Sequence, residues 1–163
     1  MSSYLKQFQR DNPMLPFVPE ILESLIRRLM KIFIRKTVID EADTAYSLIK
    51  IDLQKRENYL PHELVKLPTA SKSSLSSLQA SNTKKLKFEV ECAALVKGTV
   101  EKLQEKSPLK YLFVRSLSSL LPKNMVESKN CTRKFEKVVD RLYTANHVSS
   151  KEADNAKLQV SWL

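Results

Sequence analysis

The sequence is nearly without glycine, and it is poor in cysteine, histidine and long apolar runs. Of its 163 residues one is glycine, Gly98, where average usage would give about eleven. Hairpin turns, strand bulges and phosphate-cradling loops depend on glycine because they need backbone with positive φ. The composition therefore argues against β-sandwiches, barrels, dinucleotide-binding domains and P-loop enzymes. It favours helices joined by Pro, Ser and Asn turns.

Few side chains are available for disulfide or metal chemistry. The cysteines and histidines are His62, Cys92, Cys131 and His147, with successive gaps of 30, 39 and 16 residues. Zinc ligands usually come in close pairs instead. We therefore expect no metal site and no cofactor, and two free thiols in a reducing, intracellular compartment.

No segment is apolar enough to predict a membrane span or a signal peptide. The densest apolar stretch, residues 25–34, is interrupted by Arg27, Arg28 and Lys31, and a transmembrane helix needs about 20 mainly apolar residues. Residues 1–13 are polar and lack the apolar region of a signal peptide. The sequence thus predicts no association with the membrane.

Positive charge is in excess, and it is unevenly distributed. The net charge is +10, of which residues 1–36 carry +4, residues 37–70 carry −2 and residues 71–163 carry +8. An excess of this size is compatible with nucleic acid, an anionic membrane surface or an acidic partner protein, and it does not choose among them. An acidic connector would then separate two basic blocks.

Apolar residues recur at helical spacing along most of the chain. Steps of three and four predict helices over about 19–36, 38–48, 83–106, 109–121 and 128–145. Ser149 followed by Glu152 is a capping box and predicts a last helix from about Ser150. We therefore predict an all-α fold, a single irregular bundle of five or six helices in one domain over residues 1–163.

The connecting segments are expected to be irregular. Pro13, Pro16 and Pro19 predict an extended lead-in over residues 1–18. Residues 46–53 fit either a strand or a helix end, and residues 54–70 are expected to be a loop. Eight Ser or Thr among residues 69–83 predict a flexible connector.

Several acidic side chains lie close together in the sequence, and carboxylates of this kind can bind a catalytic magnesium ion. Asp40, Glu41 and Asp43 cluster, and Asp52 ends a short apolar run, as the first metal ligand does in ribonuclease-H-like nucleases. Such a site needs further acids on neighbouring strands, and no other strand pattern is present. We therefore interpret these residues as a solvated helix face and a loop, and expect no enzyme activity.

Basic residues at helical spacing are the strongest functional signal. Arg27, Lys31 and Arg35, with Arg28 beside them, predict a cationic ridge on the first long helix. A second ridge comprises Arg133, Lys134, Lys137 and Arg141. Each ridge fits either a solvated face opposite a core stripe or a phosphate-binding surface. Because Glu136 and Asp140 interrupt the second ridge, the sequence favours the first as the DNA contact.

Three segments, in order, resemble one protein family. They are FQRDNPMLPFVPEILESLIRRLMKIFIRK at 8–36, EKSPLKYLFVRSLSSLLP at 105–122 and VDRLYTANHVSSKEADNA at 139–156, and KIDLQKRENYLP at 50–61 also fits the pattern. They resemble the central helical region of uncharacterised animal proteins derived from hAT-superfamily DNA transposases. The resemblance implies a helical insertion and its flank, and hence a fragment of a longer protein. It assigns no catalytic acid here.

The resemblance and the charge together set the functional expectations. We expect a non-catalytic remnant of a hAT-like transposase, nuclear, with weak sequence-independent DNA binding. The alternative is a helical protein-interaction module whose apolar faces promote self-association or binding of another protein. An active nuclease that uses Asp52 is the third reading.

Overall fold

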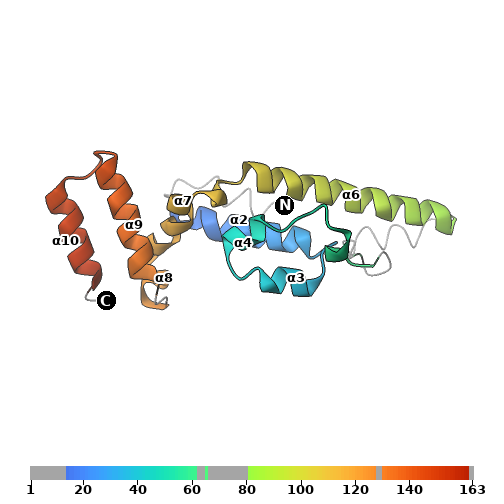
Figure 1. The fold of residues 1–163 in the computed structure, drawn as a ribbon, viewed down its shortest axis with the longest axis horizontal. Helices are drawn as coiled ribbons and strands as arrows, with labels where there is room; N and C mark the ends of the chain where they lie inside the picture. Colours follow the sequence, from blue (N-terminus) through green and yellow to red (C-terminus); the bar gives the residue numbers. More distant parts are fainter. Residues whose placement is uncertain (1–13, 62–64, 66–80, 128–129, 162–163) are drawn as a thin grey trace. The chain divides into compact units, whose positions relative to one another are not determined.

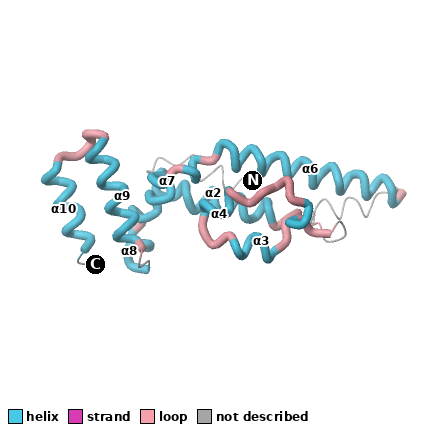
Figure 2. Tube along the Cα trace, in the orientation of Figure 1, coloured by secondary structure: helices cyan, strands magenta, loops and turns pink. Residues whose placement is uncertain are grey.

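The computed structural model describes residues 14–61, 65, 81–127 and 130–161. Helices and turns make up these residues, with no strand among them, so the all-α prediction is confirmed (Figure 2). In chain order the elements are η1 (Leu15–Phe17), α2 (Val18–Met30), α3 (Lys36–Glu41), α4 (Ala45–Ile49), η2 (Arg56–Asn58), α6 (Asn82–Lys106), η4 (Pro108–Lys110), α7 (Leu112–Ser116), η5 (Leu117–Leu120), α8 (Pro122–Glu127), α9 (Cys131–Thr144) and α10 (Ser150–Ser161).

The chain divides into two compact units. The described residues of 23–107 form one unit, and those of 1–22 and 108–163 form the other (Figure 1). Each unit buries its own apolar side chains. Ile26, Met30, Ile34, Leu48 and Val100 are almost completely buried in the first unit, and Leu109 and Val138 are almost completely buried in the second.

The first long helix is shorter than its apolar pattern predicts. The pattern runs to residue 36, but α2 ends at Met30. The amides of Phe33 and Ile34 both donate to the carbonyl of Met30, which closes a turn. Phe33 and Ile34 are then buried, and Ile34 forms an isolated antiparallel bridge with Tyr59. Because these side chains are apolar and buried by a turn, their spacing in the sequence resembles the continuation of the apolar stripe of α2.

Two further helical segments differ from the prediction. The helix expected over 38–48 is two short helices, α3 and α4, because the chain breaks after Glu41 and restarts at a capping box made by Thr44 and Ser47. Residues 46–53 therefore hold a helix end, not a strand. The helix expected over 109–121 is divided into η4, α7 and η5.

Proline starts elements in this chain more often than it ends them. Pro122 is the first residue of α8, a helix that the sequence pattern does not predict. Pro16 lies in the 3₁₀ turn η1, so the end of the lead-in expected to be extended is helical. Proline has no N–H to satisfy and a helical φ, which suits the first turn of a helix. Residues 1–13 and 69–80 of the lead-in and connector lie outside the described residues.

α9 and α10 lie side by side as an antiparallel pair (Figure 1). The predicted capping box is present: the Ser149 amide donates to Glu152 Oε2 at 2.7 Å, and the Glu152 amide donates to Ser149 Oγ at 3.3 Å. The Ser149 hydroxyl also donates to Glu152 Oε2 at 2.7 Å. The bonds from the Ser149 amide and hydroxyl stabilise the charged carboxylate, so they lower the pKa of Glu152. Cys131, Val138, Val139 and Ala153 are buried in this unit.

Asn146 carries the turn between α9 and α10 in the left-handed region, with φ 58°. Its amide donates to the Tyr143 carbonyl, and the His147 amide donates to the Leu142 carbonyl at 2.9 Å. This is the Schellman pattern, which usually has glycine at the left-handed position. The only glycine, Gly98, lies within α6 instead, so asparagine takes this role.

Substitution of Asn146 tests this end of α9. Asn146→Ala should lower the free energy of unfolding by about 1 kcal/mol, because alanine lacks the local hydrogen bonding that lets asparagine adopt positive φ. Asn146→Gly should match or exceed the wild-type stability. Urea denaturation followed by circular dichroism measures both, and equal losses in the two variants would contradict the assignment.

Candidate nucleic-acid interface

The first predicted ridge does not lie on one helix. α2 ends before Lys31, which lies in the following turn, and Arg35 takes the N-cap position of α3. Arg28 is exposed in the last turn of α2. The regular spacing that favoured this ridge depended on a helix reaching residue 36. That helix is shorter, so the geometric basis of the prediction is wrong.

Arg27 is a structural residue of the first ridge. Its Nε donates to Glu23 Oε1 at 3.0 Å, and its two terminal nitrogens donate to the carbonyls of Ile39 at 3.0 Å and Ala42 at 2.6 Å. Only 24% of its side chain is exposed. The planar guanidinium fits this fork of acceptors, and it fastens α2 to the carboxyl end of α3.

Arg35 is also engaged within the fold. Its Nε donates to the Tyr59 carbonyl at 2.9 Å, and its amide donates to the Asn58 carbonyl. These bonds join the start of α3 to the segment that follows η2. Lys31 remains exposed, so the first ridge offers fewer available cations than its sequence suggests.

The second predicted ridge lies on a single regular helix. α9 spans 14 residues and carries all four of its cations, Arg133, Lys134, Lys137 and Arg141. At 100° per residue they cover about a quarter of the helix circumference. The buried residues Cys131, Val138 and Val139 lie on the opposite side, so the cations share the outer face of α9.

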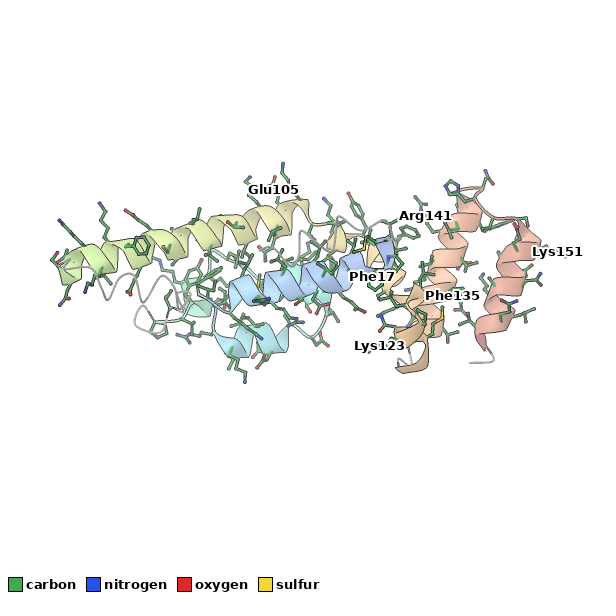
Figure 3. All side chains as sticks on the ribbon, turned by 180° about the vertical axis from the view of Figure 1, so that it is seen from behind. Phe17, Glu105, Lys123, Phe135, Arg141 and Lys151 are labelled. Carbon is green, nitrogen blue, oxygen red and sulfur yellow. The ribbon has the colours of Figure 1, made fainter. Side chains whose placement is uncertain are left out.

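The surroundings of this basic face leave its charge largely exposed. Arg133, Lys134 and Arg141 are exposed, and Lys137 is half-buried. Asp140, which interrupts the ridge in the sequence, forms an ion pair with Lys157 of α10, with Nζ–Oδ1 of 2.5 Å. Arg141 lies on the side of α9 away from α10, and Lys151 lies on the outer side of α10 (Figure 3). Asp140 is therefore held by the neighbouring helix, and Glu136 is the other acid of α9.

The acidic residues weighed as metal ligands are not brought together. Asp40 lies on α3, where its carboxylate is 4.0 Å from Lys36 Nζ. Asp43 lies between α3 and α4, and its carboxylate accepts a hydrogen bond from Ser47 Oγ of α4. Asp52 is an exposed loop residue whose Oδ1 accepts from the Gln54 amide at 2.8 Å. Within the described part of the chain, no three His, Cys, Asp or Glu side chains are close enough to hold a metal ion.

Comparison with protein-family models, with curated proteins and with solved structures gave no match for this chain. The likeness to hAT-like transposases stays a prediction from the sequence segments that carry it. In the part of the chain that the structure describes, none of the helices has the length and apolar character needed to span a membrane.

Replacement of Arg27 separates its structural role from that of an exposed cation. Arg27→Gln should lower the free energy of unfolding by about 1–3 kcal/mol, because two carbonyl acceptors lose a charged donor. Lys31→Gln should change it by less than about 0.5 kcal/mol, as expected for an exposed side chain. Urea denaturation of the two variants measures the difference, and a negligible effect of Arg27→Gln would contradict the role assigned to it.

Proposed function

We propose that this protein binds the phosphate backbone of DNA without sequence preference, through the basic face of α9. The observation that carries the proposal is the set of four cations on the outer face of one regular helix, opposite its buried side. Residues four apart on a helix rise about 6 Å, so Arg133, Lys137 and Arg141 form an extended positive strip. Such a strip binds a polyanion by releasing its condensed counterions.

The charge around α9 supports this choice over the first ridge. Asp140, one of the two acids within the α9 ridge, is paired with Lys157. Arg27 and Arg35 of the first ridge, in contrast, donate to backbone carbonyls of their own unit. Cations that already donate to backbone carbonyls of the fold cannot turn to a phosphate without breaking those bonds. The net charge of +10 adds a general attraction for DNA.

We further propose that the chain is a non-catalytic derivative of a hAT-like transposase. The sequence segments at 8–36, 105–122 and 139–156 support this origin, and no catalytic acid could be carried over to a position of this chain. A nuclear location would follow from such an origin. DNA affinity retained by the helical region would then be a property of its charge alone.

Neutralising the α9 face tests the proposed DNA contact. The triple variant Arg133→Gln, Lys137→Gln, Arg141→Gln should weaken binding to a short duplex at low salt. It should also flatten the plot of log affinity against log salt by about 2–3, since each phosphate contact contributes about 0.9 to the slope. Fluorescence anisotropy over a series of salt concentrations measures both quantities.

The matched control removes the same net charge elsewhere. Lys31, Lys55 and Lys106 are exposed, and their joint replacement by Gln should leave most of the salt slope unchanged. Equal losses in the two triple variants would mean that net charge alone attracts DNA and that α9 is no specific contact. Absence of binding by the wild-type protein at low salt would reject the function.

A second candidate function is self-association through α6. Its residues 86–95 expose several large apolar side chains, with Leu95 72%, Leu86 51%, Val90 42% and Phe88 41% exposed. Monomeric proteins rarely expose contiguous apolar surface without a use for it. Leu95 and Phe88 fall on one side of α6 by helical spacing, and such a strip favours contact with another protein surface.

Leu95→Lys tests this second function. A charge at the centre of an apolar contact should abolish concentration-dependent oligomers, while the fold is kept because the side chain is exposed. Gln159→Lys adds the same charge at an exposed polar position of α10 and should have no effect. Light scattering after size-exclusion chromatography measures the mass, and a wild-type protein that stays monomeric at high concentration would reject self-association.

A further inference from the structure

An apolar groove lies within the unit formed by residues 23–107, which does not contain α9. One wall is the face of α6 with Val90, Ala93, Ala94 and Lys97, and the other comes from the side chains of Phe33, Tyr59, Leu60 and Val65. Its volume is about 260 Å³. The rings of Phe33 and Tyr59 lie 5.9 Å apart, centre to centre, at a tilt of 43°. The groove is therefore apolar and partly aromatic.

Lys97 is the single charged side chain among the described residues that line this groove. Its Nζ lies 5.4 Å from the centre of the Tyr59 ring, within the range of a cation–π contact. The Tyr59 hydroxyl donates to the Leu53 carbonyl, which fixes the ring. Hydrogen bonding to Tyr59 raises the pKa of Lys97, so the groove holds a positive charge at neutral pH.

The ammonium of Lys97 keeps capacity for a further partner. Its ion pair with Glu101 has an Nζ–Oε1 distance of 3.7 Å, which is longer than a hydrogen bond. The same Glu101 oxygen accepts from Gln54 Nε2 at 3.0 Å. Because an ammonium has three donors and 31% of the Lys97 side chain is exposed, a ligand can reach it from the groove.

We propose that this groove binds an amphipathic anion, a molecule with an apolar body and a carboxylate at one end. The apolar body would lie between the α6 face and the Phe33–Tyr59 pair, and the carboxylate would contact Lys97. The charge selects this class, because an apolar groove with one cation and no unpaired acid favours an anion over a neutral or cationic ligand of the same shape. A ligand of this kind buries its chain and keeps its charge paired.

Isothermal titration calorimetry with three probes of equal chain length tests the class of ligand. Decanoate, decanol and decylammonium should bind the wild-type protein in that order of affinity, at concentrations below their self-aggregation. Lys97→Gln should weaken decanoate binding about tenfold, as expected for a charged hydrogen bond. The same variant should leave decanol binding unchanged. Lys102→Gln, an exposed lysine of the same helix, is the matched control.

A substitution that fills the groove gives an independent check. Ala94 is exposed on α6, so Ala94→Leu should fold normally and abolish binding of decanoate and decanol together. The proposal fails if decanoate gives no heat, if Lys97→Gln and Lys102→Gln reduce its affinity equally, or if Ala94→Leu leaves it unchanged. A wild-type dimer that Ala94→Leu converts to monomer would assign the groove to a second copy of the chain, and would also overturn the proposal.

Discussion

The hydrogen bonds of Arg27 join α2 to the end of α3 in the unit formed by residues 23–107. One guanidinium joins the acid one turn earlier on α2 to two carbonyls at the end of α3. The carbonyls of Ile39 and Ala42 lie at the carboxyl end of α3. Carbonyls at this end of a helix have no amide donors from a following helical turn. The short α3 and the end of α2 thus depend on a charge that the sequence pattern places on a solvated face. Ile26 and Met30 on the neighbouring turns are fully buried.

That constraint also decides which positive charges are available to a partner. The chain carries 28 Lys and Arg, but Arg27 and Arg35 are engaged with backbone carbonyls of the fold. Lys97 lines a groove, and Lys157 forms an ion pair with Asp140 of α9. The last of these contacts is the one that favours DNA binding, because it pairs Asp140 and leaves the basic face of α9 outward. Net charge therefore suggests a polyanionic partner, but contacts within each unit determine which basic side chains are available to contact it.

The sequence was sufficient where apolar residues recur at helical spacing along an uninterrupted helix. α6 and α9 begin and end within a few residues of their predicted bounds. α10 begins at the predicted residue, and the Ser149–Glu152 capping box is present as expected. The sequence was insufficient where apolar side chains are buried outside a helix. Phe33 and Ile34 are buried by a turn and a bridge to Tyr59, yet their spacing continues the stripe of α2. Helical periodicity cannot distinguish these two cases.

The candidate sites depended on contacts between distant segments, which local patterns do not contain. The acceptors of Arg27 lie 12 and 15 residues further along the chain, and the one local signal was Glu23 a turn before it. The groove joins Tyr59 to Lys97 across a long connector, and nothing in either segment indicates the other. For α9 the sequence placed the four cations on one helix, and they lie on one helix in the structure. The pairing of Asp140 with Lys157 depends on a neighbouring helix whose position the sequence does not give.

The most direct test of the account is to map the DNA contact residue by residue by NMR. On addition of a short duplex at low salt, amide and side-chain signals of Arg133, Lys134, Lys137 and Arg141 should shift together and should return when salt is raised. Signals of Arg27 and Arg35 should stay in place. Shifts centred on α2 and α3, or spread evenly over exposed lysines of both units, would contradict the assignment of the contact to α9.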